Sequence, residues 1–150
     1  MSKMPIICLL LSLPALSWGQ DFQTVVDFNI DLPALDSASA ARRVAADGRI
    51  VLLEGVVGKI EGGMSNEAFE LRITLANGFW IGTTDIRTYS CLVRFTGDEW
   101  QDLLSTAEED DPMEQKIVEG SRLLIAARVS GYDEAAAMAT AKGEAIRILR

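Results

Sequence analysis

Histidine is absent from this chain of 150 residues, and its absence removes several kinds of catalysis. Ser-His-Asp and Cys-His mechanisms both need an imidazole base that works near neutral pH. A zinc site would also lack its commonest nitrogen ligand. Any catalysis would therefore depend on carboxylates, lysine, tyrosine or a bound ion. We expect a protein that is not an enzyme, with no catalytic residues, no metal site and no cofactor.

Cysteine is almost as scarce, since the chain holds only Cys8 and Cys91. Cys8 lies in an N-terminal segment that we expect to be removed, so the mature chain would have one thiol and no internal disulfide. A domain of this size can be held together by core burial alone. Cys91 alternates with Val93 and Phe95, which predicts a buried, inert thiol and not a redox-active one.

The sequence has a single long apolar run, and it lies at the N-terminus. Lys3 precedes the apolar segment Ile6–Leu13, and small residues follow within Ala15–Gly19. This pattern is typical of a cleavable secretory signal and is too short for a membrane anchor. We therefore predict a signal peptide at residues 1–19, a periplasmic or secreted location and no membrane span.

Basic residues are outnumbered, with 14 Lys and Arg against 22 Asp and Glu, which gives a net charge of −8. Removal of Lys3 with the signal would leave 13 against 22. A chain this acidic repels phosphate backbones and anionic membranes at long range. Neutral or basic partners are therefore expected, and nucleic acid is disfavoured. The simplest interpretation of the acidity itself is solubility.

No repeat or low-complexity linker divides the mature chain, so one domain is expected. Residues 20–48 are predicted to form an N-terminal arm and a helix, and residues 49–150 the main domain. Asp36 and Ser37 can cap the helix, which continues through alanine-rich sequence and ends at Asp47-Gly48.

Strand patterns recur in the main domain. The predicted strands are Ile50–Ile60, Phe69–Leu75, Tyr89–Phe95, Leu123–Val129 and Ala145–Leu149. Gly55 and Gly58 predict a bulge or sharp bend in the first of them.

The segments between these strands are interpreted from their turn and helix formers. Residues 61–66 and the dipeptide Asn77-Gly78 predict turns, and Phe79–Thr88 an apolar island followed by a loop. Asp98 can cap a short helix as far as Leu104, with Trp100 as a core plug. Ala135–Ala141 is taken as a loop with at most one helical turn.

Three strands, a short helix and two further strands follow the order of the OB-fold. The predicted fold class is all-β with short helices. It is a five-stranded Greek-key barrel with a helix between the third and fourth strands, preceded by the N-terminal helix.

Several segments resemble the tRNA-anticodon-like OB-fold family of secreted bacterial proteins. Arg49–Val57 resembles the opening strand of that family, Ala38–Gly48 its preceding helix and Cys91–Phe95 its third strand. Glu119–Gly131 resembles its fourth strand, with the pattern G-x-x-L-x-I-x-A-x-V-x-G. The resemblance implies an OB-fold and a bacterial exported protein. It implies no catalytic residues, because the family has no agreed activity.

A candidate binding site follows from aromatic and basic residues around the second and third strands. OB-folds bind single strands or sugars by stacking on these strands and their flanking loops. The candidate ligand-binding residues are Phe79, Trp80, Tyr89, Arg72 and Arg87. The sequence leaves open whether Trp80 belongs to the core or to the surface.

Three functional hypotheses remain at this point. The leading one is a secreted OB-fold module that binds an unknown protein or peptide without catalysis. The alternative is oligonucleotide or oligosaccharide binding on the barrel face, ranked lower because of charge and compartment. The third is an enzyme, which would need carboxylates such as Glu54, Glu70 and Asp85 to converge on one pocket. The acidic segment Glu108–Asp111 is interpreted as a solvated loop and not a calcium site.

Overall fold

The computed structural model describes residues 25–104 and 116–149. The predicted signal peptide at 1–19 and the acidic loop Glu108–Asp111 lie outside the described residues. The strands are β1 (Val26–Asp27), β2 (Ile50–Ser65), β3 (Ala68–Ile81), β4 (Asp85–Thr96), β5 (Arg122–Asp133) and β6 (Met138–Leu149). The helices are η1 (Pro33–Leu35), α2 (Ala38–Asp47) and η2 (Asp98–Leu103).

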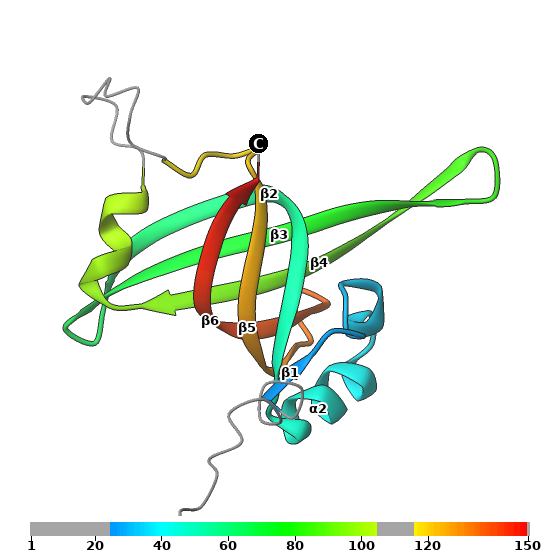
Figure 1. The fold of residues 1–150 in the computed structure, drawn as a ribbon, viewed down its shortest axis with the longest axis horizontal. Coiled ribbons are helices and arrows are strands. Elements are labelled where there is room, and N and C mark those ends of the chain that lie inside the picture. The colour runs from blue at the N-terminus through cyan, green and yellow to red at the C-terminus, as the bar shows by residue number, and fades with distance from the viewer. Residues whose placement is uncertain (1–24, 105–115, 150) are drawn as a thin grey trace, which may run out of the picture.

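The strands β2 to β6 close into a barrel, and the short β1 lies parallel to the start of β2 (Figure 1). Neighbours follow the order β2-β3-β4-β6-β5, and β5 pairs with β2 to complete the ring. The β4–β6 pair is parallel, and the other barrel pairs are antiparallel. This is the connectivity of an OB-like barrel. The predicted five-stranded barrel with OB-like connectivity is confirmed.

The N-terminal helix α2 is capped by Ser37, one of the two predicted N-cap residues, and ends at the predicted Gly48. The Ser37 hydroxyl accepts a hydrogen bond from the Ala40 N–H at 3.2 Å, and Gly48 ends the helix with a φ of 71°. Glycine adopts this left-handed conformation without the steric cost of a side chain. α2 packs mainly against β5 and lies at one end of the barrel (Figure 1).

The predicted helix between the third and fourth strands needs a correction. Residues Asp98–Leu103 form a 3₁₀ helix, and residues 105–115 lie outside the described part. Asp98 is not its cap, because its Oδ1 accepts a hydrogen bond from the Phe69 N–H at 3.3 Å. Trp100 packs on Phe95 with 4.7 Å between ring centroids, so the predicted core contact of Trp100 is confirmed.

Two predicted turns are wrong because β2, β3 and β4 are longer than their buried segments. β2 runs to Ser65, and the turn lies at Asn66 and Glu67, both with positive φ. The pair Asn77-Gly78 lies inside β3, and the chain reverses at residues 82–84. The predicted loop within Phe79–Thr88 is therefore the end of a β3–β4 hairpin.

The predicted loop at Ala135–Ala141 is wrong for the second half of this alanine-rich segment. The turn covers residues 134–137, and β6 begins at Met138. Small inward residues suit β6 because its first half faces the crowded barrel interior, where Ala139 and Ala141 are buried.

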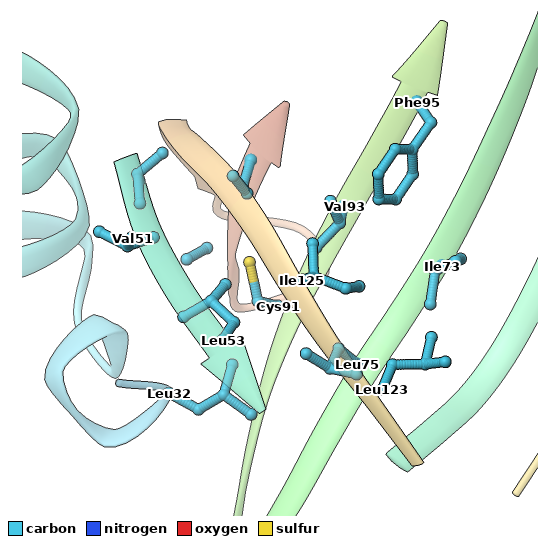
Figure 2. Close-up of a cluster of buried hydrophobic side chains, with 14 of the residues drawn as sticks. Leu32, Val51, Leu53, Ile73, Leu75, Cys91, Val93, Phe95, Leu123 and Ile125 are labelled. Carbon is cyan, nitrogen blue, oxygen red and sulfur yellow. The ribbon is translucent and has the colours of Figure 1, made fainter. Parts of the chain in front are cut away.

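The core fills the barrel from the inward faces of its strands (Figure 2). Its fully buried side chains include Val51, Leu53, Ile73, Leu75, Cys91, Val93, Phe95, Leu123 and Ile125. A register shift between Val57 and Lys59 confirms the bulge predicted at Gly58. The bulge lets β2 bend from its pairing with β5 to its pairing with β3.

Beyond the barrel, β3 and β4 continue as a two-stranded hairpin, which we call the arm (residues 77–90). Pairing of β2 with β3 ends at Ala76, and pairing of β4 with β6 begins at Cys91. The arm strands therefore pair only with each other among the described residues. The arm projects from the barrel in Figure 1, where it is the green hairpin.

Candidate binding face on β3 and β4

The five predicted site residues do not form one platform, because they lie on opposite faces of β3 and β4. Strand alternation places Arg72 and Trp80 on the face that continues the barrel exterior. Phe79, Arg87 and Tyr89 share the opposite face, which continues the inward face of the barrel strands.

The inward-facing residues of the arm contact one another and the N-terminal segment. The rings of Phe79 and Tyr89 meet edge to face, with centroids 5.6 Å apart. The Arg87 guanidinium lies 5.3 Å from the Tyr89 ring centroid, and its Nη2 donates to Asp36 Oδ2 at 2.7 Å. These contacts hold the arm against the residue that follows η1. Arg87 is thus occupied by protein groups.

The outer face of β3 and β4 forms a continuous surface that we call the strip. It starts at the cross-strand pair Arg72 and Arg94 and ends at the pair Trp80 and Ile86. The outward residues between them are Thr74, Leu92, Ala76, Ser90, Gly78 and Thr88. The strip has no acidic residue between its ends, and at a strand rise of about 3.3 Å per residue it is about 26 Å long.

Trp80 is a surface residue, which answers the question that the sequence left open. Its side chain is 69% exposed, and Ile86 opposite it is 58% exposed. An exposed tryptophan at the end of the strip can stack on a planar group of a ligand.

Cations continue around the barrel from the base of the strip. Register pairs Arg72 with Arg94, Arg94 with Lys142 and Lys142 with Arg128, across β3, β4, β6 and β5. We call these four residues the basic row. The adjacent residues in sequence are buried, namely Ile73, Val93, Ala141 and Val129. The four basic side chains therefore point outward from the barrel.

The outer members of the basic row have carboxylate partners, whereas the inner members have none in the part of the chain that the structure describes. Arg72 Nε lies 3.6 Å from Glu70 Oε1, and Arg128 Nε lies 3.0 Å from Glu144 Oε1. Arg94 and Lys142 form no ion pair within residues 25–104 and 116–149.

Glu61 lies opposite Arg72 on β2, but it is engaged by another cation. Lys59 Nζ lies 2.9 Å from Glu61 Oε1, and this hydrogen bond lowers the pKa of Glu61 below its usual value. Glu61, the acid opposite the β3 end of the basic row, is therefore paired mainly with Lys59.

Sequence reasoning identified Arg72 but missed the rest of the basic row as site residues. The alternation of Arg94 with the buried Val93 and Phe95 is a signal that it points outward. Lys142 gives no such signal, because it lies between the predicted loop Ala135–Ala141 and the predicted strand Ala145–Leu149. Only the sheet register brings Lys142 beside Arg94.

The carboxylates named for the enzyme hypothesis do not converge. Glu54 on β2 pairs with Arg122 at 2.5 Å, and Glu70 lies beside Arg72 near the start of β3. Asp85 is at the far end of the hairpin, opposite Ile81. Within the described part of the chain, no group of three or more His, Cys, Asp or Glu side chains could hold a metal ion.

The only cysteine among the described residues has the predicted environment. Cys91 is fully buried in the barrel, and this burial raises the pKa of its thiol from 9.0 to about 12. A thiol that stays protonated at neutral pH is a poor nucleophile. Among the helices of the described ranges, none has the length and apolar character needed to cross a membrane.

Comparison with known proteins finds no family model and no curated protein that matches the sequence. The resemblance to the tRNA-anticodon-like family therefore stays a prediction.

Solved structures with a partial structural likeness to this chain include the following three. Yeast Stn1 and Ten1 give a TM-score of 0.38 at 11% identity, covering 67% of this chain and 43% of that one. The single-stranded DNA-binding protein of Thermus aquaticus, a deletion mutant, gives 0.42 at 18% identity, covering 67% and 50%. The mitochondrial single-stranded DNA-binding protein Rim1 of S. cerevisiae gives 0.43 at 13% identity, covering 69% and 95%.

The chain therefore spans half or less of the first two of these proteins. These likenesses are partial, and the OB-like assignment rests on the strand connectivity given above.

Proposed function

We propose that the protein is a non-enzymatic OB-fold binding module whose ligand is a single-stranded oligonucleotide lying along the strip. The observation that carries this proposal is the acid-free surface that joins Arg72 and Arg94 to the exposed Trp80. Non-specific single-strand binding combines a basic groove for the backbone with aromatic side chains for the bases. The two ends of the strip offer these two contacts.

The net charge of −8 is the main argument against an anionic ligand. That argument has less weight at the basic row, because four cations gather on one band of the barrel. The acids described beside them, Glu61, Glu70 and Glu144, are each paired with a cation. An oligosaccharide could also stack on Trp80, but a neutral sugar would make no use of the basic row. This is why we prefer phosphate-bearing single strands to sugars.

The test uses a labelled oligothymidylate of about 15 nucleotides, a length at the upper end of OB-fold site sizes. Fluorescence anisotropy measures its binding. Trp80→Ala should weaken binding about tenfold or more, since stacking of one base is worth about 1–3 kcal/mol. Ile81→Ala is the matched control, because Ile81 is a similarly exposed apolar residue on the opposite face of the arm. No binding at low salt, or equal losses in both variants, would refute the proposal.

A protein or peptide ligand is the second candidate, favoured by a different observation. Trp80, Ile81 and Ile86 are 69%, 50% and 58% exposed at the tip of the projecting arm. Apolar side chains gathered on such a tip suit a hydrophobic protein groove. Capture of a partner from an envelope extract should then be lost in Trp80→Ala and Ile86→Ala and retained in Arg94→Gln. Retained capture in both tip variants would exclude this candidate.

The export predicted from residues 1–19 accompanies either candidate as a separate proposal. Fractionation of cells that express the full chain tests it. A mature protein beginning near Gln20 outside the cytoplasm is expected, and an uncleaved cytoplasmic chain would contradict it.

A further inference from the structure

The basic row sets like charges directly opposite each other on neighbouring strands. Adjacent strands lie about 4.8 Å apart, and like charges at opposed positions destabilise a sheet. Three consecutive cross-strand pairs of this kind occur here, Arg72 with Arg94, Arg94 with Lys142 and Lys142 with Arg128. A protein with more acids than bases could relieve this repulsion with carboxylates at every position.

Among the described residues, the carboxylates that pair with the row are at its two ends. Glu70 lies beside Arg72, and Glu144 beside Arg128. Arg128 also donates from Nη1 to the Gly48 carbonyl oxygen at 2.6 Å, which fixes its orientation. On the side that leads to the arm, the next outward pair after Arg94 and Lys142 is Leu92 and Thr140, which carry no charge. On the other side are Glu70 and Glu144, and each of them is paired with an outer arginine of the row.

We propose that Arg94 and Lys142, flanked by Arg72 and Arg128, form a binding site for consecutive phosphate groups of a linear phosphate polymer. The inference deepens the proposed function and rests on it for one of the two sources of such phosphates, the backbone of an oligonucleotide. Inorganic polyphosphate is the other source. A bound phosphate supplies the negative charge that the sheet lacks between these two cations.

The chemistry of the site favours phosphate over a single carboxylate. An arginine guanidinium can donate two parallel hydrogen bonds to two phosphate oxygens, and a lysine ammonium acts as a point charge beside it. The row extends over four strands, about 14 Å at the usual strand spacing, so it offers room for more than one anionic group. It crosses the strands, whereas the strip follows them, and the two share only Arg72 and Arg94.

The direct test uses tripolyphosphate, which has phosphates but no bases. Titration into the ¹⁵N-labelled protein at low salt should shift the amide signals of Leu92–Phe95 and Ala141–Gly143. Arg94→Gln and Lys142→Gln should each weaken binding at least fivefold. Arg147→Gln is the matched control, because Arg147 is another exposed cation of β6 with no ion pair in the described chain. Equal weakening by all three variants, or shifts that avoid β4 and β6, would overturn the inference.

Oligothymidylate binding then separates this inference from the proposed function. Lys142→Gln should reduce the slope of log affinity against log salt by about 0.7, the contribution of one single-strand phosphate contact. Tripolyphosphate binding at the row without any oligonucleotide binding would support the phosphate site and refute the proposed function. Oligonucleotide binding that needs Trp80 but is unchanged in Lys142→Gln would keep the function and refute the phosphate site.

Discussion

At the scale of single residues, the barrel depends on a glycine, because a side chain at this position would not fit. Gly143 lies on the inner side of β6, and a Cβ at this position would overlap the ring of Phe95. Phe95 is completely buried, and the Trp100 ring covers it at a centroid distance of 4.7 Å. The ring of Phe95 therefore fills the space beside Gly143, and Trp100 packs against the same ring.

We predict that Gly143→Ala lowers the free energy of unfolding by about 1–3 kcal/mol, the usual cost of overpacking a well-filled core. Thermal unfolding followed by circular dichroism measures it as a lower Tm. Gly63→Ala is the control, because a Cβ there meets no atom within 4 Å. The control should leave the Tm unchanged or slightly raised, and equal destabilisation of the two variants would contradict the packing argument.

At the scale of elements, the arm differs from the rest of β3 and β4. Inside the barrel each strand has two neighbours and a buried face, whereas the arm strands have one neighbour each. The exposed ion pair between Arg87 and Asp36 is a weak attachment to the rest of the molecule. Two-stranded ribbons are marginally stable in water, so the arm should open more often than the barrel.

Hydrogen exchange observed by NMR tests this difference within the same two strands. Hydrogen-bonded amides of the arm should exchange at least about tenfold faster than those of Leu71–Leu75 and Cys91–Phe95, because local opening has a lower free energy than global unfolding. Equal protection along the full length of β3 would mean that the arm belongs to the cooperative unit of the barrel.

The same contrast explains how much of the fold the sequence predicts. Alternation of apolar and polar residues predicts Phe69–Leu75 and Tyr89–Phe95, because these segments have one face in the core. Residues 77–81 have no core beneath them, so no alternation marks their strand. The start of β6 is not predicted because it is rich in alanine. Alanine fits the crowded interior of the barrel, but its intrinsic preference is for helix.

The candidate site was predictable to the same extent. Trp80 and Arg72 could be named from residue type and from their place near the predicted second and third strands. These two residues lie on the opposite face of the hairpin from Phe79, Arg87 and Tyr89. This division follows from strand alternation along the arm, and the sequence did not predict that β3 and β4 extend into the arm. Lys142 became a neighbour of Arg94 only through a parallel pairing between segments 48 positions apart, and local sequence carries no trace of such a pairing.

At the scale of the whole molecule, two electrostatic effects act at different ranges. The net charge of −8 repels a polyanion at distances comparable to the size of the domain. The basic row attracts phosphates only when they approach its four side chains. Salt screens the first effect at encounter distance, because the Debye length falls from about 30 Å at 0.01 M to about 8 Å at 0.15 M.

We therefore predict that salt raises both rate constants of oligothymidylate binding, to different extents. The association rate constant should rise between about 0.01 and 0.15 M salt, since screening removes the long-range repulsion. The dissociation rate constant should rise more steeply, so that affinity still falls. Stopped-flow fluorescence measures both rates, and Lys142→Gln should act mainly on dissociation. An association rate that falls throughout would mean that the field of the basic row outweighs that of the acidic body during approach, as in electrostatically steered complexes.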